Sequence, residues 1–551
     1  MFSADNKSKL KCCVARSNEG AWKQYFQRWL PPILLGVIGL THWILAKLWV
    51  GQNFFLRFNN SHANLTALSA AYRDIVYEGK GFSSLVFRNL GHGLGDYRPA
   101  LIPKIYLFAM FLAPHQGILL VNFFYLIVIM SGIYCATKFL IGDRYYSLLA
   151  ASVFSCYPLA WMQLVSCEAL LAVWASVIWG FYWYLRSEFF TRFWPTVGVG
   201  LFLILAFYSD RWSGGFFLSM VLFIPENFRH KKSWLHMAGM LVVVLACIWP
   251  FYYQWIRALD WSDGLVDFFD IAGDHIGVLE SYQLVLWDFE KLQAHLLYYF
   301  VSLPDMLLGY GFTALFAIGL WQLRRHRSFL IFVVMLSLPA AFFVVCIKKH
   351  YLFIMPLYLW FAMVTVMGIF FIRHQGWRRW VVALLIVLSA LHLGHIFVPQ
   401  GVLGKILFSN NFEAMHARRI PKLFSWDCFG TADKQKLESI MTGVSPFLGT
   451  MPRTKATLMV DLKEHVLHHT VVFLLQTRWK DGKVLNVGFE DHVDPRDWAP
   501  VIQGYLVSDR GQYEAGRVQG SVGGCPYAGL EPIGRFFHDE VVLYKIKRAE
   551  S

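Results

Sequence analysis

The chain has 551 residues, of which 56% are hydrophobic, 17% aromatic and only 16% charged. A soluble domain carries roughly 25% charged residues, and a single core stops growing at about 250–300 residues, so a large core does not explain this deficit. The composition excludes a purely soluble protein and indicates that much of the surface meets lipid.

The formal net charge of +14 is carried largely by short basic clusters that lie between apolar runs. Three of them occupy 229–232, 324–327 and 373–379. Clusters in such positions are typical of the cytoplasmic loops of membrane proteins, and they lack the continuous basic stripe of a nucleic-acid-binding domain. We therefore expect no nucleic-acid partner.

In chain order, the N-terminal segment 1–29 is polar and basic, and the first apolar run follows it directly. This arrangement does not fit a cleavable signal peptide and predicts a cytoplasmic N-terminus before a retained span. Because roughly 20 apolar residues cross a bilayer as a helix, the sequence predicts spans at 30–50, 117–140, 144–160, 168–187, 194–209, 213–228, 235–256, 303–323, 328–347, 351–372 and 378–398. The run 100–114 contains Pro103 and Pro114 and is expected to be a partial helix.

Two long loops, 51–99 and 257–302, interrupt the predicted multispan domain 30–399. The positive-inside rule places both loops, the 161–167 turn and the tail on the side opposite the basic clusters. Loop 51–99 contains a helix-like stretch at 65–77. Long loops in compact domains are usually functional.

The tail, 400–551, is polar, and we expect a small soluble α+β domain on the extracytoplasmic side. Segments 471–476 and 484–489 alternate, with Asp481 and Gly482 between them, which is typical of a β-hairpin. Residues 541–546 are expected to form another strand and 431–442 a helix. We thus expect a polytopic α-helical membrane protein of about eleven to thirteen spans with this domain attached.

Charged residues at or near membrane depth carry the candidate chemistry, because such positions are energetically costly. They fall into four sets on the predicted extracytoplasmic side. The sets are Asp74 with Glu78, Asp96 with Arg98, Glu168, and the basic pair Lys348 and Lys349 with His350 and Tyr351. Arg211, beside Asp210, is a further cation on the same side.

The order of these features resembles the GT-C superfamily of multispan glycosyltransferases. Its members include the protein O-mannosyltransferases and the aminoarabinose transferases of lipid A. Three stretches carry the resemblance over about residues 30–400: DYRPAL at 96–101, SCEAL at 166–170 and KHYLFIMPL at 349–357. The family usually has an Asp, often Asp-Glu, just after the first span and ahead of a Gly. The corresponding positions before Gly79 hold Asn64 and Leu65.

The resemblance implies transfer of a sugar from a polyprenyl-phosphate donor to an extracytoplasmic lipid, glycan or protein. An attacking hydroxyl needs a carboxylate to take its proton, and the phosphate leaving group needs cations in a dry site. Asp96 or Asp74 is then the base, and Glu168 orients the acceptor or the sugar. The donor phosphate is bound by Arg98, Arg211, Lys348, Lys349 and Tyr351. The family includes members with and without a divalent cation such as Mg or Mn, and membrane lipids are partners of any member.

Each candidate also has a purely structural interpretation. Asp96 pairs with Arg98, Asp74 and Glu78 lie on the solvated face of a helix, and Glu168 caps the following span. Lys348 and Lys349 are boundary charges, and Asp210 pairs with Arg211. The tail residues His465, His468 and His469 are expected at the surface rather than on a metal. Cys428 and Cys525 can pair only if the tail is extracytoplasmic.

Two other functions remain open from the sequence. A transporter for a lipid-linked glycan predicts charges in mid-span and inverted repeats, and neither pattern is found. A non-catalytic scaffold or accessory subunit of the same fold is favoured by Asn64 and Leu65. A bacterial inner membrane is the expected location, since no eukaryotic retrieval signal is found.

Overall fold

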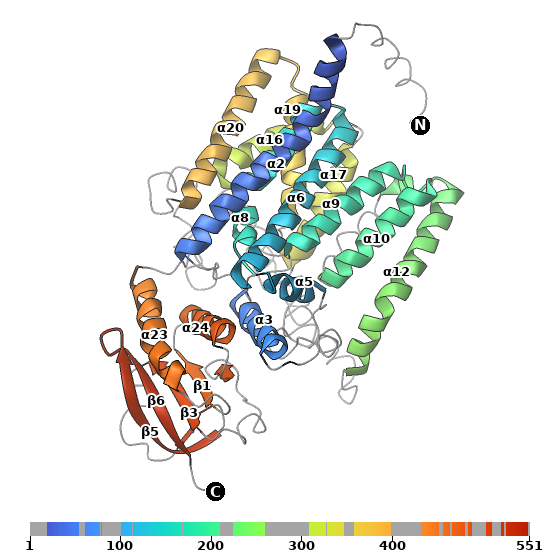
Figure 1. Cartoon of the computed structure of the whole chain (residues 1–551). Helices are drawn as coiled ribbons and strands as arrows, with labels where there is room; N and C mark the ends of the chain where they lie inside the picture. The colour runs from blue at the N-terminus through green and yellow to red at the C-terminus, as the bar shows by residue number, and fades with distance from the viewer. Residues whose placement is uncertain are drawn as a thin grey trace.

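The structure is a computed structural model in which a bundle of long helices carries a small α+β unit at one end (Figure 1). It describes residues 19–53, 61–77, 79, 101–112, 114–167, 170–209, 224–258, 308–326, 328–345, 357–397, 431–450, 456–462, 465–479, 483–486, 503–509, 520–522 and 525–548. The predicted helical membrane architecture with a C-terminal sheet is confirmed.

The helices follow the apolar runs of the sequence. In the bundle they are α2 (Glu19–Asn53), α5 (Leu101–Met110), α6 (Pro114–Ile141), α7 (Arg144–Cys156), α8 (Pro158–Leu164), α9 (Leu170–Arg186), α10 (Phe193–Ser209), α12 (Lys231–Ala258), α16 (Gly309–Leu323), α17 (Phe329–Val345), α19 (Leu357–Phe370) and α20 (Gln375–Phe397). Helix α19 is buried along almost its whole length at the centre of the bundle.

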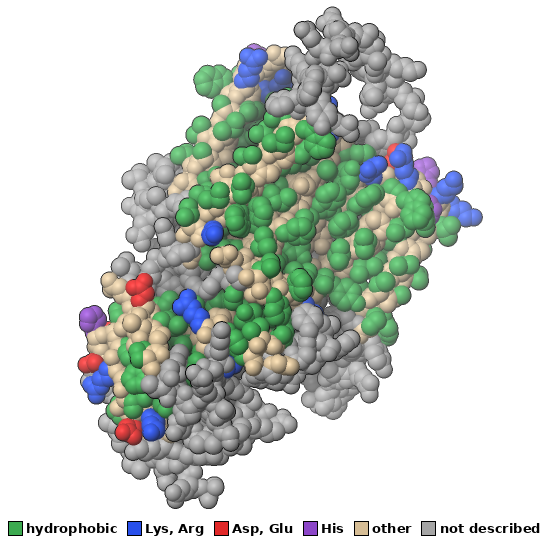
Figure 2. Space-filling model, in the orientation of Figure 1, with side chains coloured by type: hydrophobic (Ala, Val, Ile, Leu, Met, Phe, Trp, Pro, Cys, Tyr) green, Lys and Arg blue, Asp and Glu red, His purple; other side chains and the backbone are tan. Residues whose placement is uncertain are grey.

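Several helices expose apolar faces that water would not tolerate. Helix α2 buries Ala46 and Trp49 but exposes a row of large apolar side chains, namely Ile33, Val37, Leu40, Ile44 and Leu48. Figure 2 shows hydrophobic side chains covering most of the described bundle surface on this face. Within the described ranges, four helices are long and apolar enough to cross a membrane: 29–50, 116–141, 231–250 and 375–394. The full number of spans stays a prediction.

A short helix and an interrupted span lie in the first part of the bundle. Helix α5 has ten residues, which rise only about 15 Å against a hydrocarbon core of roughly 30 Å. It is therefore the partial helix expected for 100–114. The expected span 144–160 is instead two helices, because Pro158 forces the preceding Tyr157 out of the helical region to φ −65° and ψ 134°.

The expected span 213–228 also ends differently from the prediction. Its last four residues form a separate 3₁₀ helix, η2 (Pro225–Phe228), and residues 210–223 lie outside the described ranges. Pro225 stands at the start of η2, where its missing N–H is harmless.

The C-terminal unit contains α23 (Thr431–Thr450), β1 (Ala456–Asp461), α24 (His465–Arg478), β2 (Lys483–Asn486), β3 (Gln503–Asp509), β4 (Gly520–Val522), β5 (Cys525–Phe536) and β6 (Val541–Arg548). These strands form a six-stranded sheet in the order β2-β1-β3-β6-β5-β4. Strand β1 pairs in parallel with β2 and β3, whereas β6 pairs antiparallel with β3 and β5. The expected α+β class, the helix at 431–442 and the strand at 541–546 are confirmed.

The predicted hairpin around Asp481 and Gly482 is wrong. Residues 471–476 belong to helix α24, which crosses over from β1 to the parallel strand β2. Helix α24 buries Val471 and Leu475 against the sheet, and Phe473 and Leu474 belong to the hydrophobic core of the bundle. Because both faces of this helix are buried, its apolar residues are contiguous in the sequence. The 3.6-residue spacing of apolar positions that indicates a helix is therefore absent.

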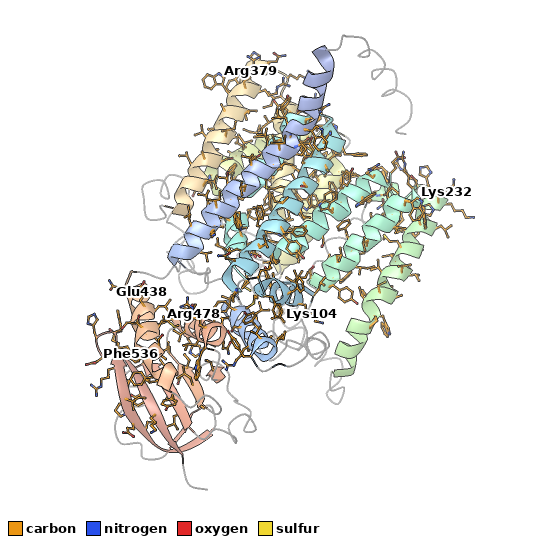
Figure 3. The ribbon with its side chains drawn as sticks, viewed as in Figure 1. Lys104, Lys232, Arg379, Glu438, Arg478 and Phe536 are labelled. Atoms are coloured by element: carbon orange, nitrogen blue, oxygen red, sulfur yellow. The ribbon has the colours of Figure 1, made fainter. Side chains whose placement is uncertain are left out.

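The bundle has two chemically different ends. His326 contacts the ring of Phe371 at 4.8 Å, and Arg378 lies 6.0 Å from the ring of Tyr146. In Figure 3, Lys232 and Arg379 lie far from Glu438, Arg478 and Phe536 of the C-terminal unit. We call the end that carries 229–232, 324–326 and 373–379 the basic end, and the opposite end, next to α24, the sheet end.

Candidate functional site

Most of the candidate residues lie outside the residues that the structure describes. These are Asp96, Arg98, Glu168, Arg211, Lys348, Lys349 and Tyr351, together with Glu78. Asp74 lies on a described helix, α3 (Ser61–Val76), which confirms the helix expected at 65–77. The site is therefore built from the described elements that flank these residues in the chain.

The described ends of four helices show where the chain next to the candidate segments lies. Helix α9 ends near the basic end, since Phe190, just beyond it, accepts a hydrogen bond from His236 Nδ1 at 2.9 Å, so its start at Leu170 lies at the sheet end. Helix α10 begins beside His236, with ring centroids of Phe193 and His236 at 5.7 Å, and therefore ends at the sheet end.

Helix α19 runs in the corresponding sense, because Phe370 near its end packs on Tyr146 at 5.2 Å. Its start at Leu357 thus lies towards the sheet end. Helix α5 packs against α3, and Tyr72 contacts Phe111 at 5.8 Å. The chain just after 96–98, just after Glu168, just before Arg211 and just after 348–351 therefore reaches one end of the bundle.

Helix α3 covers this end and is held there by the C-terminal unit (Figure 1). Its residues Leu65, Leu68 and Ala71 are buried, so a segment of the first long loop forms part of the folded core. Ser69 Oγ donates a hydrogen bond to Gln476 Oε1 on α24, and Gln476 Nε2 donates to the carbonyl of Val484 on β2 at 3.3 Å. One amide thus joins α3, α24 and the sheet.

Side chains of α3 and of the residue just after α3 donate hydrogen bonds to backbone carbonyls at the C-terminal end of α24. Arg73 Nη1 donates to the carbonyl of Trp479 at 3.2 Å, and Tyr77 OH donates to that of Thr477 at 3.0 Å. The last carbonyls of a helix have no partner within it and attract positive charge. Partial burial and the neighbouring Tyr72 raise the pKa of Tyr77, although Arg73 opposes them, so the phenol keeps the proton that it donates.

Arg73 itself is buried and lies about equally far from two aromatic rings. Its guanidinium carbon is 6.0 Å from the ring of Tyr77 and 6.0 Å from that of Trp479. Aromatic faces attract cations within about 6 Å. Asp74 therefore follows a residue whose position is fixed by contacts with the C-terminal unit.

A second polar group lies beneath this surface, in the core of the bundle. Asn122 on α6 is fully buried and accepts a hydrogen bond from Tyr106 OH of α5 at 2.5 Å. Its Nδ2 donates to the carbonyls of Leu164 at 3.0 Å and Ser166 at 2.7 Å. The connection 165–167 between α8 and α9 is thus attached to both α5 and α6.

Of the three histidines of α24, His468 is the one whose side chain the structure describes. His468 is buried, which corrects the expectation of a surface residue, and its Nδ1 accepts a hydrogen bond from the backbone N–H of Leu462 at 3.1 Å. Among the described residues, no three His, Cys, Asp or Glu side chains come together as possible metal ligands. The divalent cation expected from the family resemblance stays a prediction.

Two residues that matter for this arrangement were not selected from the sequence. Arg73 interrupts the apolar face of α3 at helical spacing from Leu65 and Ser69, and Asn122 interrupts the long apolar run 117–140. A polar residue inside such a run is costly without partners. That signal was available, but it does not name the partner.

The fold of the chain is similar to that of ArnT from Cupriavidus metallidurans. The structure bound to undecaprenyl phosphate has a TM-score of 0.59 at 12% sequence identity, over 93% of this chain and 97% of that chain. For the apo structure the TM-score is 0.58 at 13% identity, over 94% and 98%. No family model matches the sequence, and no curated protein matches it. The chain therefore has a GT-C-like fold.

Proposed function

We propose that this protein is a membrane glycosyltransferase that moves a sugar from a polyprenyl-phosphate donor to an extracytoplasmic acceptor. The proposal rests on one observation. The described chain next to each set of candidate residues reaches the sheet end of the bundle. A fold cannot name a reaction by itself. An anionic lipid donor needs carboxylates and cations at one lipid–water boundary, and the described chain next to the candidate residues reaches one end of the bundle.

The proposed chemistry assigns a separate role to each set of residues. Asp96 or Asp74 takes the proton of the attacking hydroxyl as the new glycosidic bond forms. Arg98, Arg211, Lys348, Lys349 and Tyr351 bind the phosphate and stabilise its charge as the bond to the sugar breaks. Glu168 orients the acceptor or the sugar. The acceptor is a lipid, a glycan or a protein.

The fold neighbour supports the donor class. ArnT from Cupriavidus metallidurans was solved with undecaprenyl phosphate, a polyprenyl phosphate. The apolar helix faces of this chain suit the hydrocarbon part of such a donor. We also propose a bacterial inner membrane with the basic end in the cytoplasm, because positive charge favours that side.

The decisive experiment measures sugar transfer by the purified chain in lipid nanodiscs supplied with polyprenyl-phosphate sugars. We expect Asp96→Asn or Asp74→Asn to lower kcat by about a hundredfold or more, as for loss of a general base. Lys349→Met should instead raise the KM for the donor. Asp143→Asn is the matched control, because this acid caps α7 at the basic end through Tyr145 N (2.8 Å) and Tyr146 N (3.0 Å). Full activity in both aspartate variants would refute the assignment of the base.

A non-catalytic scaffold of the same fold is the second candidate. The observation in its favour is that Asn64 and Leu65 stand where the family usually has Asp-Glu. Leu65 is moreover a residue of α3 whose side chain is buried in the core of the bundle. A wild-type chain that binds a polyprenyl phosphate but transfers no sugar to any lipid, glycan or protein acceptor would favour the scaffold.

A further inference from the structure

The buried Asn122 joins three helices and one connection through a single amide. Its oxygen accepts from Tyr106 of α5, and its nitrogen donates to two carbonyls at and just after the end of α8. Ser166 also bonds back to the carbonyl of Gln163, through its N–H at 3.4 Å and its Oγ at 3.3 Å. We call Tyr106, Asn122, Leu164 and Ser166 the amide hub.

The chemistry of the hub fits asparagine closely. A carboxamide offers two N–H donors and one carbonyl acceptor, and here the donors meet two carbonyls while the acceptor meets a hydroxyl. The carbonyl of Leu164 belongs to the last turn of α8, where no partner exists within the helix. A leucine of similar volume would leave all three groups buried without this partner.

The hub lies between two candidate segments of the proposed site. Helix α5 begins at Leu101, three residues after Arg98, and Glu168 directly follows Cys167. Cys167 is fully buried, so the connection that leads to Glu168 is packed into the core and not free at the surface.

We propose that Asn122, together with Tyr106, is a positioning residue that fixes the connection 165–167, the stretch of chain that leads to Glu168. This inference rests on the proposed function, in which Glu168 orients the acceptor or the sugar. The amide hub connects the chain that leads to Glu168 with α5, the helix that follows Asp96 and Arg98.

Cys167 is a native reporter for the structural half of the proposal. We would measure the alkylation rates of individual cysteines by N-ethylmaleimide in the full-length protein, by mass spectrometry of the peptides. Cys167 and Cys156 are both buried, so both should label slowly in wild type. Asn122→Leu should accelerate labelling at Cys167 by about tenfold and the milder Tyr106→Phe by about threefold.

Two comparisons separate a local effect from general unfolding. Cys156 should stay slow in both variants, because it lies at the end of α7, outside the hub. Tyr184→Phe is the matched control, since Tyr184 OH donates to Asn227 Oδ1 at 2.9 Å in an equally buried pair near the basic end. We expect this control to leave both Cys167 labelling and sugar transfer unchanged.

The catalytic half is tested by kinetics on the same proteins. Tyr106→Phe should lower kcat by about fivefold with little change in the KM for the donor, because the acid that it positions acts in the transition state. Unchanged labelling at Cys167 in both variants would overturn the hub. Faster labelling with an unchanged kcat would overturn its link to Glu168. An inactive wild type would instead refute the proposed function and that link, while the labelling still decides the hub.

Discussion

Arg73 shows how one buried cation can join two distant parts of a chain. It is separated from Trp479 by 406 positions in the sequence, yet it supplies a hydrogen bond to the carbonyl of that residue and lies over its ring. Removing the guanidinium leaves a buried carbonyl without this donor. The loss of a hydrogen bond from a charged group is typically worth about 1.5–3 kcal/mol.

We therefore predict that Arg73→Met lowers the thermal unfolding temperature of the purified protein clearly. Arg186→Met is the matched control. Arg186 is exposed, and its guanidinium carbon lies 5.8 Å from the ring of Tyr182 and 5.7 Å from the ring of Trp183. An exposed cation over aromatic rings contributes less, about 0.5–1 kcal/mol. Equal shifts in the two variants would show that burial of Arg73 has no special importance.

Gly368 and Gly319 let the backbones of α19 and α16 touch. A Cβ atom added at Gly368 would lie 2.2 Å from Gly319 Cα. We predict that Gly368→Ala destabilises the bundle by about 1–3 kcal/mol, as overpacking does. Gly239→Ala in α12 should be neutral or slightly stabilising, because the added Cβ meets nothing within 4 Å. Unfolding of both variants in a denaturing detergent measures the difference in their stability. Equal stability of the two variants would contradict the close approach of α16 and α19.

At the scale of elements, apolar length alone predicts most helices of the bundle. Runs such as 117–140 and 378–398 correspond to α6 and α20 within a few residues. The break at Tyr157 was visible as Pro158 in the sequence, yet length outweighed it in the prediction. Helix α24 could not be predicted in the same way, because the residues that bury its second face come from α3, about 400 positions earlier.

The two faces of α24 lead to a prediction at the same scale. Leu474 belongs to the bundle core, whereas Leu475 belongs to the core of the sheet. Leu474→Asp should expose α3 to protease and leave the sheet protected. Leu475→Asp should instead make the sheet itself sensitive. Limited proteolysis with mass spectrometry of the fragments distinguishes the two patterns, and identical patterns would mean that the helix has no separate faces.

For the whole molecule, the positive-inside pattern predicted that the three basic clusters share one side. The described parts of these clusters do lie at one end of the bundle, and the C-terminal unit lies at the other. The candidate site was predictable from the sequence only as residue types in order. Which atoms meet depends on contacts between segments far apart in sequence, such as those of Asn122 on α6 and Gln476 on α24.

Topology can be tested with single cysteines and a membrane-impermeant maleimide in cells whose outer membrane is permeabilised. We predict that Glu438→Cys and Arg535→Cys label from outside. Lys232→Cys and Arg379→Cys should label only after the inner membrane is opened, since positive charge favours the cytoplasmic side. All four residues are exposed in the structure. Labelling of positions 438 and 232 from the same side would remove the basis of the proposed site.

The docking of α24 on α3 has a consequence for protein engineering. A chimera that replaced only residues 431–548 with the tail of another protein of this fold would bring a foreign helix against Ser69, Arg73 and Tyr77. Those three side chains would then face unmatched groups. The tail and α3 therefore form one exchangeable module, and a successful graft has to carry both.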